Sequence, residues 1–542
     1  MISDLMINAI EDLIGELKSK GVRYVFGIEG GSWVPYMESM RKNGIEFILV
    51  ANEASAGIMA DVCFRITGIP GVCYATYGPG ATNLSTGVGC AYLDRSAVIA
   101  LTSEFDEKQS GKRVQMNIDH QLLFKGITKY TFRLNNNHIG DSVDRAFRLS
   151  EAEVPGPVHI GISSENINQG RGHKPSEIEP ENVIQNEFSR EKLDKLEKIL
   201  AGSKKPVIAA GLTASRLNLG NKLRKIADLH NIPILLTPMA KGMISHDHKW
   251  YSGVLFHAMS RELKEIYKNA DLVIGIGYDP VEFCYEDWMP DVPLINIDTV
   301  PADVDDSIDL ACGIAGKIDK TLDHIAGLPE IKTEWDPVEI KNVREMLQNP
   351  PSLKDGSLGP VAVLRILREN LPSDGIMTCD VGAHTHLIGQ IWEVEAPGMF
   401  IMTNGWSSMG FGIPSAIAAK LFLPDRKVVC VTGDGGFLMM AGEIVTARRL
   451  GLNVVFLILA DRELSLIRIK QDNRGITRYG VKLYDDDLIN ENTFFGVPVL
   501  TIRNEKELGP ALEKGFENKG PLIIEAVINS SEYNSMITGV FK

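Results

Sequence analysis

The chain has 542 residues, of which 44% are hydrophobic and 23% are charged. This is the composition of a soluble globular protein, long enough for about three or four domains, and it excludes a disordered, collagen-like or disulfide-scaffold protein. The 56 basic and 70 acidic residues give a net charge of −14, which disfavours nucleic acid and anionic membranes as partners.

The seven cysteines are scattered and include no C-x-x-C pair, which is typical of a reducing compartment rather than of disulfides or a zinc site. Residues 1–21 contain acids and apolar residues at helical spacing, so they predict an amphipathic helix and not a signal peptide. No apolar run approaches the ~18 residues of a membrane span. We therefore expect a cytoplasmic protein.

Short apolar runs alternate with helical stretches along almost the whole chain. Continuous apolar strands separated by helices predict parallel sheets that are covered on both faces. The runs lie in three groups: 22–28, 46–50, 71–76, 96–102 and 157–162; then 206–211, 232–237, 271–277 and 293–298; then 376–380, 428–433, 453–459 and 522–527.

Two segments of different composition separate these groups. Residues 170–189 are polar, and residues 348–360 are rich in proline and glycine. The sequence therefore predicts an α/β protein of three doubly wound parallel-sheet domains. We place the domains at 1–169, 190–347 and 360–542.

Ligands of such folds bind at the carboxyl ends of the strands, where three segments carry candidate residues. In the first, a buried strand leads into Gly433-Asp434-Gly435-Gly436 and then into a helix. The glycines allow close approach of the backbone to a phosphate, and Asp434 is suited to a hard cation. By itself, this pattern fits a purely structural turn as well as it fits a phosphate and metal site.

The second candidate is Asp461, which follows the next apolar strand 27 residues after Asp434. Adjacent parallel strands would bring the two carboxylates to one edge, where they repel each other unless a cation lies between them. Taken alone, Asp461 is better explained as a helix cap.

The third candidate is Glu53, after the strand at 46–50 and at the start of a helix rich in small residues. A carboxyl group that faces an apolar pocket can exchange a proton near neutral pH. The simpler explanation is an acid that interacts favourably with the helix dipole.

Together these segments resemble the thiamine-diphosphate (ThDP) enzymes of the acetolactate synthase/pyruvate decarboxylase superfamily. The resemblance covers nearly the whole chain and implies the order pyrimidine-binding, middle and diphosphate-binding domain. The stretches that carry it include YVFGIEGG (24–31), NEASAGIMADVCFRITGIPGV (52–72), YGPGATNLSTGVGCAYLDRSAVIALTSE (77–104), HQLLFKGITKY (120–130), VPGPVHIGI (154–162), LLTPMAKGMISHDH (235–248), CDVGAHTHLIGQIW (379–392), SSMGFGIPSAIAAK (407–420) and GDGG (433–436).

The resemblance implies a role for each matching residue. Glu53 would hydrogen-bond N1′ of the cofactor's aminopyrimidine, which favours loss of the proton from thiazolium C2. Met409 would wedge between the two rings, and the backbone at Ser407 and Met409 would contact the pyrimidine. Mg²⁺ would be held by Asp434, Asp461 and the carbonyl of Glu463.

Further residues match less specific family positions. The resemblance places His120 and Gln121 near the substrate. The remaining matches are predicted cofactor contacts: Gly30, Pro79, Asn83, His384, Gly433, Gly435 and Gly436. Glu53 and the metal motif usually come from different subunits in this family, so a homodimer or tetramer is implied.

The sequence departs from the family in two informative places. Ala460-Asp461 replaces the usual Asn-Asn, which adds a negative charge beside an anionic diphosphate. In the middle domain, 276–283 reads IGYDPVEF where FAD-dependent members have a pattern like A-R-F-D-D-R, so we do not expect FAD.

The predicted function is therefore a ThDP- and Mg²⁺-dependent 2-oxoacid decarboxylase/carboligase of acetolactate-synthase type. A simple 2-oxoacid decarboxylase and a C–N coupling enzyme like carboxyethylarginine synthase are alternatives within the superfamily. Two alternatives belong to other functional classes: an NAD-type oxidoreductase and a non-catalytic homologue. No G-x-G-x-x-G stands between a strand and a helix, which disfavours the oxidoreductase.

Overall fold

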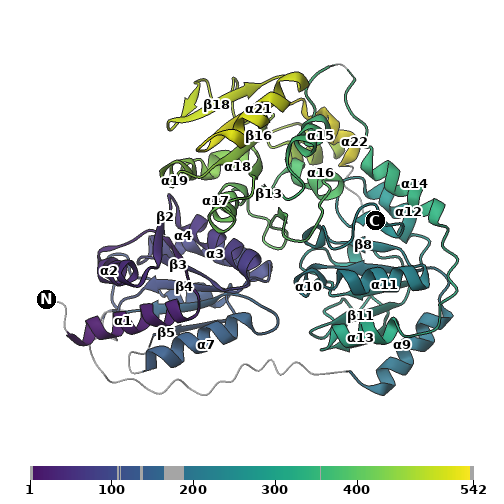
Figure 1. Ribbon diagram of the computed structural model, residues 1–542, viewed down its shortest axis with the longest axis horizontal. Helices are drawn as coiled ribbons and strands as arrows, with labels where there is room; N and C mark the ends of the chain where they lie inside the picture. Colours follow the sequence, from purple (N-terminus) through teal and green to yellow (C-terminus); the bar gives the residue numbers. More distant parts are fainter. Residues whose placement is uncertain are drawn as a thin grey trace.

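A computed structural model describes residues 4–106, 109, 111–134, 138–163, 188–354 and 356–537. Three sheets form three α/β units that follow one another along the chain (Figure 1). Most of the predicted linker at 170–189 lies outside the described residues. The prediction of doubly wound, predominantly parallel sheets is confirmed.

The first unit is a six-stranded sheet of order β2-β1-β3-β4-β6-β5, in which all neighbours are parallel. Its strands are β1 (Tyr24–Gly27), β2 (Glu46–Leu49), β3 (Gly71–Ala75), β4 (Val98–Ser103), β5 (Tyr130–Arg133) and β6 (Val158–Ile162). Its helices are α1 (Asp4–Ser19), η1 (Gly31–Trp33), α2 (Val34–Asn43), α3 (Glu53–Thr67), α4 (Pro79–Leu93), α6 (His120–Lys125) and α7 (Ile139–Glu151).

The predicted amphipathic N-terminal helix is α1. Its Ile10, Leu13 and Leu17 are buried against the unit's core, as their helical spacing requires.

The second unit has the strand order β12-β11-β10-β7-β8-β9, again all parallel. Its strands are β7 (Pro206–Ala210), β8 (Ile234–Leu236), β9 (Tyr251–Val254), β10 (Leu272–Ile276), β11 (Leu294–Asp298) and β12 (Leu310–Ala315). Its helices are α9 (Arg190–Gly202), α10 (Leu212–Arg216), α11 (Gly220–His230), η3 (Pro238–Ala240), α12 (Ser260–Tyr267), η4 (Tyr285–Asp287), α13 (Ile318–Ile325) and α14 (Pro337–Gln348).

The third unit has the order β14-β13-β15-β16-β19-β18-β17, and only the β17–β18 pair is antiparallel among these strands. Its strands are β13 (Ile376–Cys379), β14 (Phe400–Ile401), β15 (Val428–Gly433), β16 (Val454–Ala460), β17 (Thr493–Phe494), β18 (Val497–Ile502) and β19 (Leu522–Val527). Its helices are α15 (Pro360–Asn370), α16 (Ala383–Ile391), α17 (Gly412–Phe422), α18 (Asp434–Met440), α19 (Glu443–Arg449), α20 (Ser465–Asn473), α21 (Glu505–Glu517), η5 (Ser530–Glu532) and α22 (Tyr533–Met536).

Six strands were not predicted: β5, β9, β12, β14, β17 and β18. Five of them are edge strands, which pair on one side only and need no continuous apolar run. The central strands β3, β10 and β16 are buried at every position, and these were predicted.

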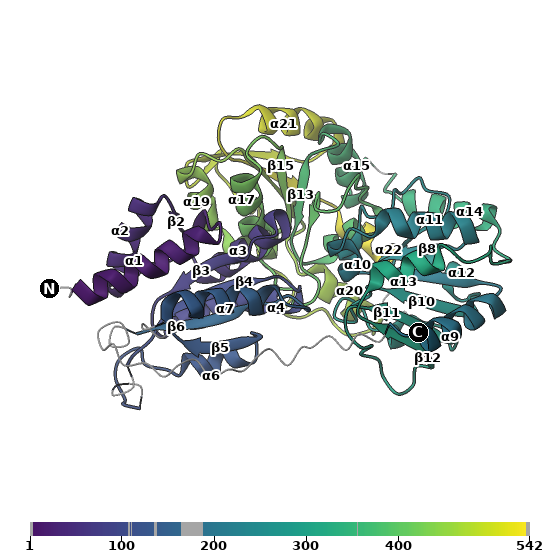
Figure 2. The ribbon, with the colours of Figure 1, turned by 60° about the horizontal axis from the view of Figure 1, so that its bottom comes forward.

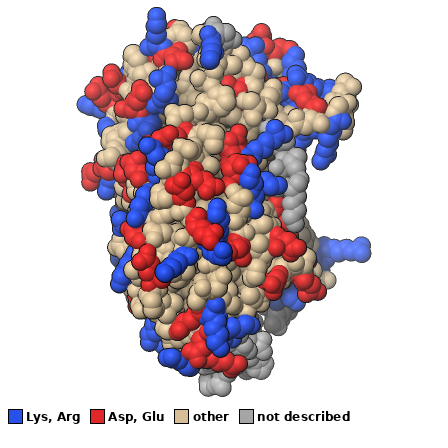
Figure 3. Space-filling view, turned by 90° about the vertical axis from the view of Figure 1, so that its right-hand side faces the viewer, with Lys and Arg blue, Asp and Glu red and all other residues tan. Residues whose placement is uncertain are grey.

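The first and third units pack directly against each other through α3 and α17, as both ribbon views show (Figures 1 and 2). On the face that the second unit presents in Figure 3, acidic and basic side chains are interspersed. No helix among the described residues is long and apolar enough to cross a membrane. All seven cysteines are free thiols, and only Cys284 is exposed.

Candidate active site

Two carboxylates converge at the carboxyl edge of the third sheet. Asp434 directly follows β15 and Asp461 directly follows β16, and these strands are neighbours, with Gly433 opposite Leu459. Asp434 is only 2% exposed, and its Oδ2 accepts hydrogen bonds from Arg462 N (2.7 Å) and from the Tyr484 hydroxyl (2.7 Å). The predicted adjacency of the two strands is correct.

The electrostatics of this pair favour a bound cation. Burial raises the pKa of the Asp434 carboxyl. Burial, and next the charge of Asp434, raise the pKa of Asp461 to about 7. A cation between them would remove the repulsion, and a set of carboxylate and carbonyl oxygens suits a hard ion such as Mg²⁺.

Asp461 is not the cap of the following helix. The N-cap of α20 is Leu464, whereas Asp461 accepts hydrogen bonds from Ser465 Oγ (2.5 Å) and Glu463 N (3.4 Å). The Glu463 carboxylate forms an ion pair with Arg468 (Nε to Oε1, 2.5 Å). The group of Glu463 considered as a metal ligand is therefore its backbone carbonyl.

The glycines beside Asp434 pack closely against neighbouring side chains. A Cβ at Gly433 would lie 3.2 Å from the His384 ring, and one at Gly435 would lie 2.9 Å from Met409 Cε. At Gly436 it would lie 2.7 Å from the Asp380 carboxyl group. The turn therefore brings its backbone against the side chains predicted to surround the cofactor.

His384 supplies an unpartnered polar atom at this place. It lies in the first turn of α16 and is 4% exposed, and burial lowers its pKa to about 4, so the ring is neutral at physiological pH. Its Nε2 has no hydrogen-bond partner among the described residues. Because a buried polar atom without a partner is costly, the free Nε2 of this ring, whose Cε1 edge lies beside Gly433, fits a site that a polar ligand completes.

Asp380 positions the loop that carries Met409, and sequence reasoning missed it. The fully buried carboxylate accepts hydrogen bonds from the backbone N–H groups of Val381 (2.7 Å), Gly410 (2.8 Å) and Gly412 (3.0 Å). Met409 is half-buried, and Ser407 is exposed with a left-handed φ of 53°. The available signal was an aspartate directly after a buried strand, as at Asp434.

In the first unit, Glu53 is the first residue of α3. Asn52 caps this helix, since its side chain accepts a hydrogen bond from Ala54 N (2.8 Å). The Glu53 side chain is 7% exposed and its Oε2 accepts a hydrogen bond from Asn83 Nδ2 (3.0 Å). A Cβ at Gly80 would lie 3.2 Å from Glu53 Oε1, so the start of α4 packs directly on the carboxylate.

The turn before α4 lies beside several other predicted residues of this unit. Gly78 has a φ of 43°, and its N–H donates to His120 Nε2 (3.2 Å), while Pro79 opens the helix. Gly30 packs beside Thr76, with no room for a Cβ.

Gln121 points away from this turn: its amide donates to Glu104 Oε1 (2.5 Å) and accepts from Thr131 Oγ1 (2.7 Å). The structure therefore places His120, but not the Gln121 side chain, at the turn.

The N-terminus of α3 also touches the third unit of the same chain. The Glu443 carboxylate accepts hydrogen bonds from Ala51 N (2.9 Å) and Asn52 N (3.1 Å). Ser55 Oγ lies 3.4 Å from Met440 Sδ. Glu443, another residue that the sequence did not single out, thus joins the Glu53 helix to the helix pair that follows Asp434.

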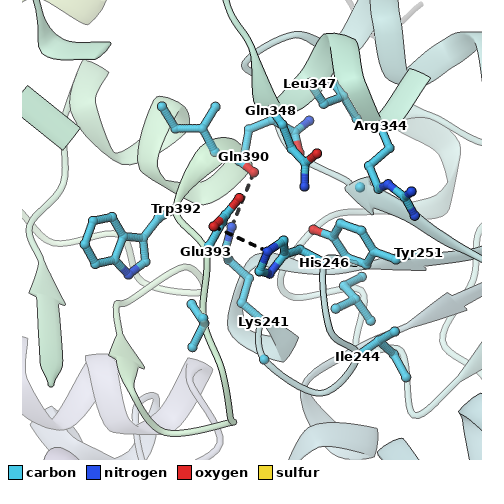
Figure 4. A pocket seen from close by; sticks show the side chains of 15 residues that line it. Lys241, Ile244, His246, Tyr251, Arg344, Leu347, Gln348, Gln390, Trp392 and Glu393 are labelled. Atoms are coloured by element: carbon cyan, nitrogen blue, oxygen red, sulfur yellow. Dashed lines mark hydrogen bonds and ion pairs between the residues drawn. The ribbon is translucent and has the colours of Figure 1, made fainter. Parts of the chain in front are cut away.

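The second unit holds the far end of α16, the helix that begins beside His384. Figure 4 shows Lys241 and His246 pointing toward Gln390 and Glu393. Lys241 Nζ donates to the carbonyl oxygen of Gly389 (2.6 Å), and burial lowers its pKa to about 7. Gln390 Oε1 accepts from Val254 N (3.0 Å), so α16 is anchored at its C-terminal end while its N-terminal turn lies at the predicted diphosphate site.

Comparison with known proteins identifies the class to which this fold and site belong. Residues 7–123 match the thiamine pyrophosphate enzyme N-terminal TPP binding domain, residues 193–325 the central domain, and residues 380–526 the C-terminal TPP binding domain. Thiamine pyrophosphate is another name for ThDP. The chain belongs to the thiamine pyrophosphate enzymes, and the prediction of a ThDP-dependent enzyme is confirmed.

The similar proteins include several acetolactate synthases. The chain is 28% identical over 564 residues to a probable acetolactate synthase large subunit of Methanococcus aeolicus, covering 98% of this chain and 94% of that protein. It is 28% identical over 532 residues to an acetolactate synthase of Bacillus subtilis (95% and 92% covered). It is 27% identical over 540 residues to a catabolic acetolactate synthase of Raoultella terrigena (97% and 96% covered).

Proposed function

We propose that the protein is a ThDP- and Mg²⁺-dependent carboligase that decarboxylates pyruvate or a related 2-oxoacid and joins the remaining fragment to a second carbonyl compound. The observation that carries this proposal is the convergence of Asp434, Asp461, the glycine turn and the unpartnered His384 nitrogen on one sheet edge. Similarity to acetolactate synthases over nearly the whole chain supports the reaction type.

The residues present fit the cofactor and its metal. Asp434, Asp461 and the Glu463 carbonyl would hold Mg²⁺. His384 and the backbone of Gly433 to Gly436 would face the diphosphate. When bound, ThDP supplies a nucleophilic carbon and then accepts the electrons released by loss of CO₂.

The chain's own contribution to proton movement is centred on Glu53. Its carboxyl group, largely removed from water and held by Asn83, would hydrogen-bond N1′ of the aminopyrimidine and share a proton there. Met409, held in place through the Asp380 carboxylate, would set the orientation of the two rings.

The second unit offers little to FAD, and we propose that the enzyme does not use it. Glu282, which is buried, accepts hydrogen bonds from Leu212 N (3.0 Å), Thr237 Oγ1 (2.6 Å) and Met239 N (3.0 Å). These donors lie at the carboxyl ends of β7 and β8, where a doubly wound sheet binds nucleotide phosphates. A protein carboxylate already occupies them.

We further propose that a homodimer, or a tetramer built from such dimers, completes the site. Exposed apolar side chains lie near both parts of the proposed site, the part in the first unit and the part in the third. They are Met116, Ile118 and Leu122 around His120, and Leu438, Met439 and Val445 after Asp434. Such surfaces on a soluble protein are typical of interfaces. We also propose the domain limits 1–169, 190–347 and 360–542 and, from the free thiols, a cytoplasmic location.

The test is to incubate the protein with ThDP, Mg²⁺ and pyruvate, measure CO₂ release and identify the carbon product. Glu53→Gln should lose at least about a hundredfold in rate, because the amide cannot share the proton. Glu46→Gln, an exposed glutamate of β2, is the matched control and should behave as wild type.

Acetolactate from the wild type would establish the carboligase. Acetaldehyde with CO₂ would instead show a simple decarboxylase. Turnover only with an amine acceptor would show a C–N coupling enzyme. If ThDP and Mg²⁺ fail to bind, the proposal is wrong.

A further inference from the structure

The first unit contains a chain of buried hydrogen bonds that begins at the turn before α4. The Gly78 N–H group can only donate, so His120 Nε2 must be the accepting, unprotonated nitrogen (3.2 Å). His120 therefore carries its proton on Nδ1, which donates to Thr102 Oγ1 (2.9 Å). His120 is 2% exposed and Thr102 is fully buried.

The direction of each following hydrogen bond is then determined. Thr102 donates its hydroxyl proton to His159 Nε2 (2.8 Å), so His159 is also protonated on Nδ1. That nitrogen donates to Thr131 Oγ1 (2.7 Å), and Thr131 donates to Gln121 Oε1 (2.7 Å). Every group along the chain of bonds accepts on one side and donates on the other.

The chain of bonds ends on an ion pair near the surface. The Gln121 amide nitrogen donates to Glu104 Oε1 (2.5 Å), while Arg133 Nε donates to Glu104 Oε2 (2.7 Å). This pattern requires both histidines to be neutral. They are, because burial lowers the pKa of His120 to about 4 and that of His159 well below its usual value.

Both ends of the chain of bonds require a glycine. A Cβ at Gly78, whose φ is 43°, would lie 2.5 Å from the carbonyl oxygen of Met116. A Cβ at Gly161 would lie 2.2 Å from Glu104 Oε1. Between them, Phe124 stacks on the His159 ring with the ring centres 4.3 Å apart. Backbone, packing and polar groups therefore specify one arrangement.

Glu104, His120 and His159 also lie close enough together to surround a metal ion. However, all four ring nitrogens of the two histidines already have hydrogen-bond partners. A metal would have to break this consistent set, so a hydrogen-bonded network explains the cluster better.

The accepting nitrogen of His120 holds the turn that positions Glu53. Gly78 is the N-cap of α4, Gly80 packs on Glu53 Oε1, and Asn83 donates to Glu53 Oε2. We propose that His159 and Thr102 are positioning residues that, through His120, hold this turn and with it the Glu53 carboxylate. The inference rests on the proposed role of Glu53.

The variant His159→Phe tests the inference, since an aromatic ring can keep the stacking on Phe124 but cannot hydrogen-bond. His230→Phe is the matched control: His230 is equally buried, with two hydrogen bonds to backbone groups, but it lies in α11 of the second unit. Thr102→Val removes the two hydrogen bonds of the Thr102 hydroxyl, to His120 and to His159, with almost no change in volume.

Three measurements are made on the full-length protein. Nitrogen NMR of histidine-labelled protein reports the protonated nitrogen of His120. Hydrogen exchange followed by mass spectrometry reports protection of the 76–83 backbone. The rate at which the protein exchanges the C2 proton of added ThDP, with Mg²⁺ in D₂O, reports the action of Glu53 without needing a substrate.

We expect His159→Phe and Thr102→Val to lose protection at 76–83 and to slow C2 exchange at saturating ThDP at least about tenfold, with His230→Phe unchanged. Equal behaviour of His159→Phe and His230→Phe would overturn the inference. A stoichiometric metal that is lost in His159→Phe would also overturn it. If wild type protects 76–83 in the expected way but accelerates no C2 exchange, the proposed function fails while the hydrogen-bonded network stands.

Discussion

Replacing Asp461 by asparagine should stabilise the metal-free protein above neutral pH. Burial and the neighbouring Asp434 raise the pKa of Asp461 from 3.8 to about 7. A group whose pKa is raised on folding loses its proton more readily in the unfolded chain, so stability falls as pH rises from about 4 to 7. At 1.36 kcal/mol per pKa unit, the full penalty at pH 8 is at most about 4 kcal/mol.

Asparagine has no charge to desolvate, and its carbonyl oxygen can still accept the Ser465 hydrogen bond. We therefore expect Asp461→Asn to raise the free energy of unfolding by about 2–4 kcal/mol at pH 8 in EDTA. The gain should shrink toward zero as the pH approaches 4. Asp425→Asn, at an exposed position before β15, is the control and should change little.

The assay is urea unfolding followed by tryptophan fluorescence, at several pH values with and without Mg²⁺. Mg²⁺ should stabilise the wild type more than the variant, because the ion relieves a repulsion that only the wild type contains. ThDP and Mg²⁺ binding should be retained or improved in the variant. A variant without extra stability at pH 8 would refute the electrostatic reasoning, and a complete loss of binding would refute the assignment of Asp461 as a ligand.

Three further predictions concern neighbouring parts of the structure. Burial lowers the pKa of Lys241 from 10.5 to about 7, so the free energy of unfolding of the wild type should fall by up to about 5 kcal/mol as the pH falls from 10.5 to 7. Lys241→Met should lack this pH dependence in urea unfolding. An identical pH dependence of the two proteins would exclude the explanation. Burial raises the pKa of Glu282 from 4.5 to about 7, so the wild type should lose stability as the pH rises through that range. Glu282→Gln should therefore raise the free energy of unfolding by up to about 3 kcal/mol at pH 8, and it should still not bind FAD. Binding of FAD by the wild type would contradict the argument. Gly435→Ala should weaken ThDP binding severalfold in a titration with Mg²⁺, because its Cβ would push aside the ends of the Met409 and Leu464 side chains. Gly520→Ala, with open space around it, should not weaken binding. Equal affinities of Gly435→Ala and the wild type would show that these side chains move aside without cost.

Much of the architecture could be predicted because it depends on local patterns. Central strands such as β16 are apolar throughout, since they are buried on both faces. Asp434 and Asp461 each end such a strand, and consecutive strands of a doubly wound sheet tend to lie side by side, so their approach followed from spacing alone. Edge strands such as β9 and β14 were not predicted because they carry no apolar run: β14 has two residues, and the four residues of β9, YSGV, include Ser and Gly.

The tertiary structure alone decided which polar groups support these residues. Tyr484 reaches Asp434 across 50 positions, and His159 reaches Thr102 across 57. Asp380 binds a loop 30 residues away. No local periodicity encodes such partners, because they are selected by the need to satisfy each buried donor and acceptor once the sheets have packed. The sequence by itself determines where the strands end and which carboxylates stand there; packing determines what holds those carboxylates in place.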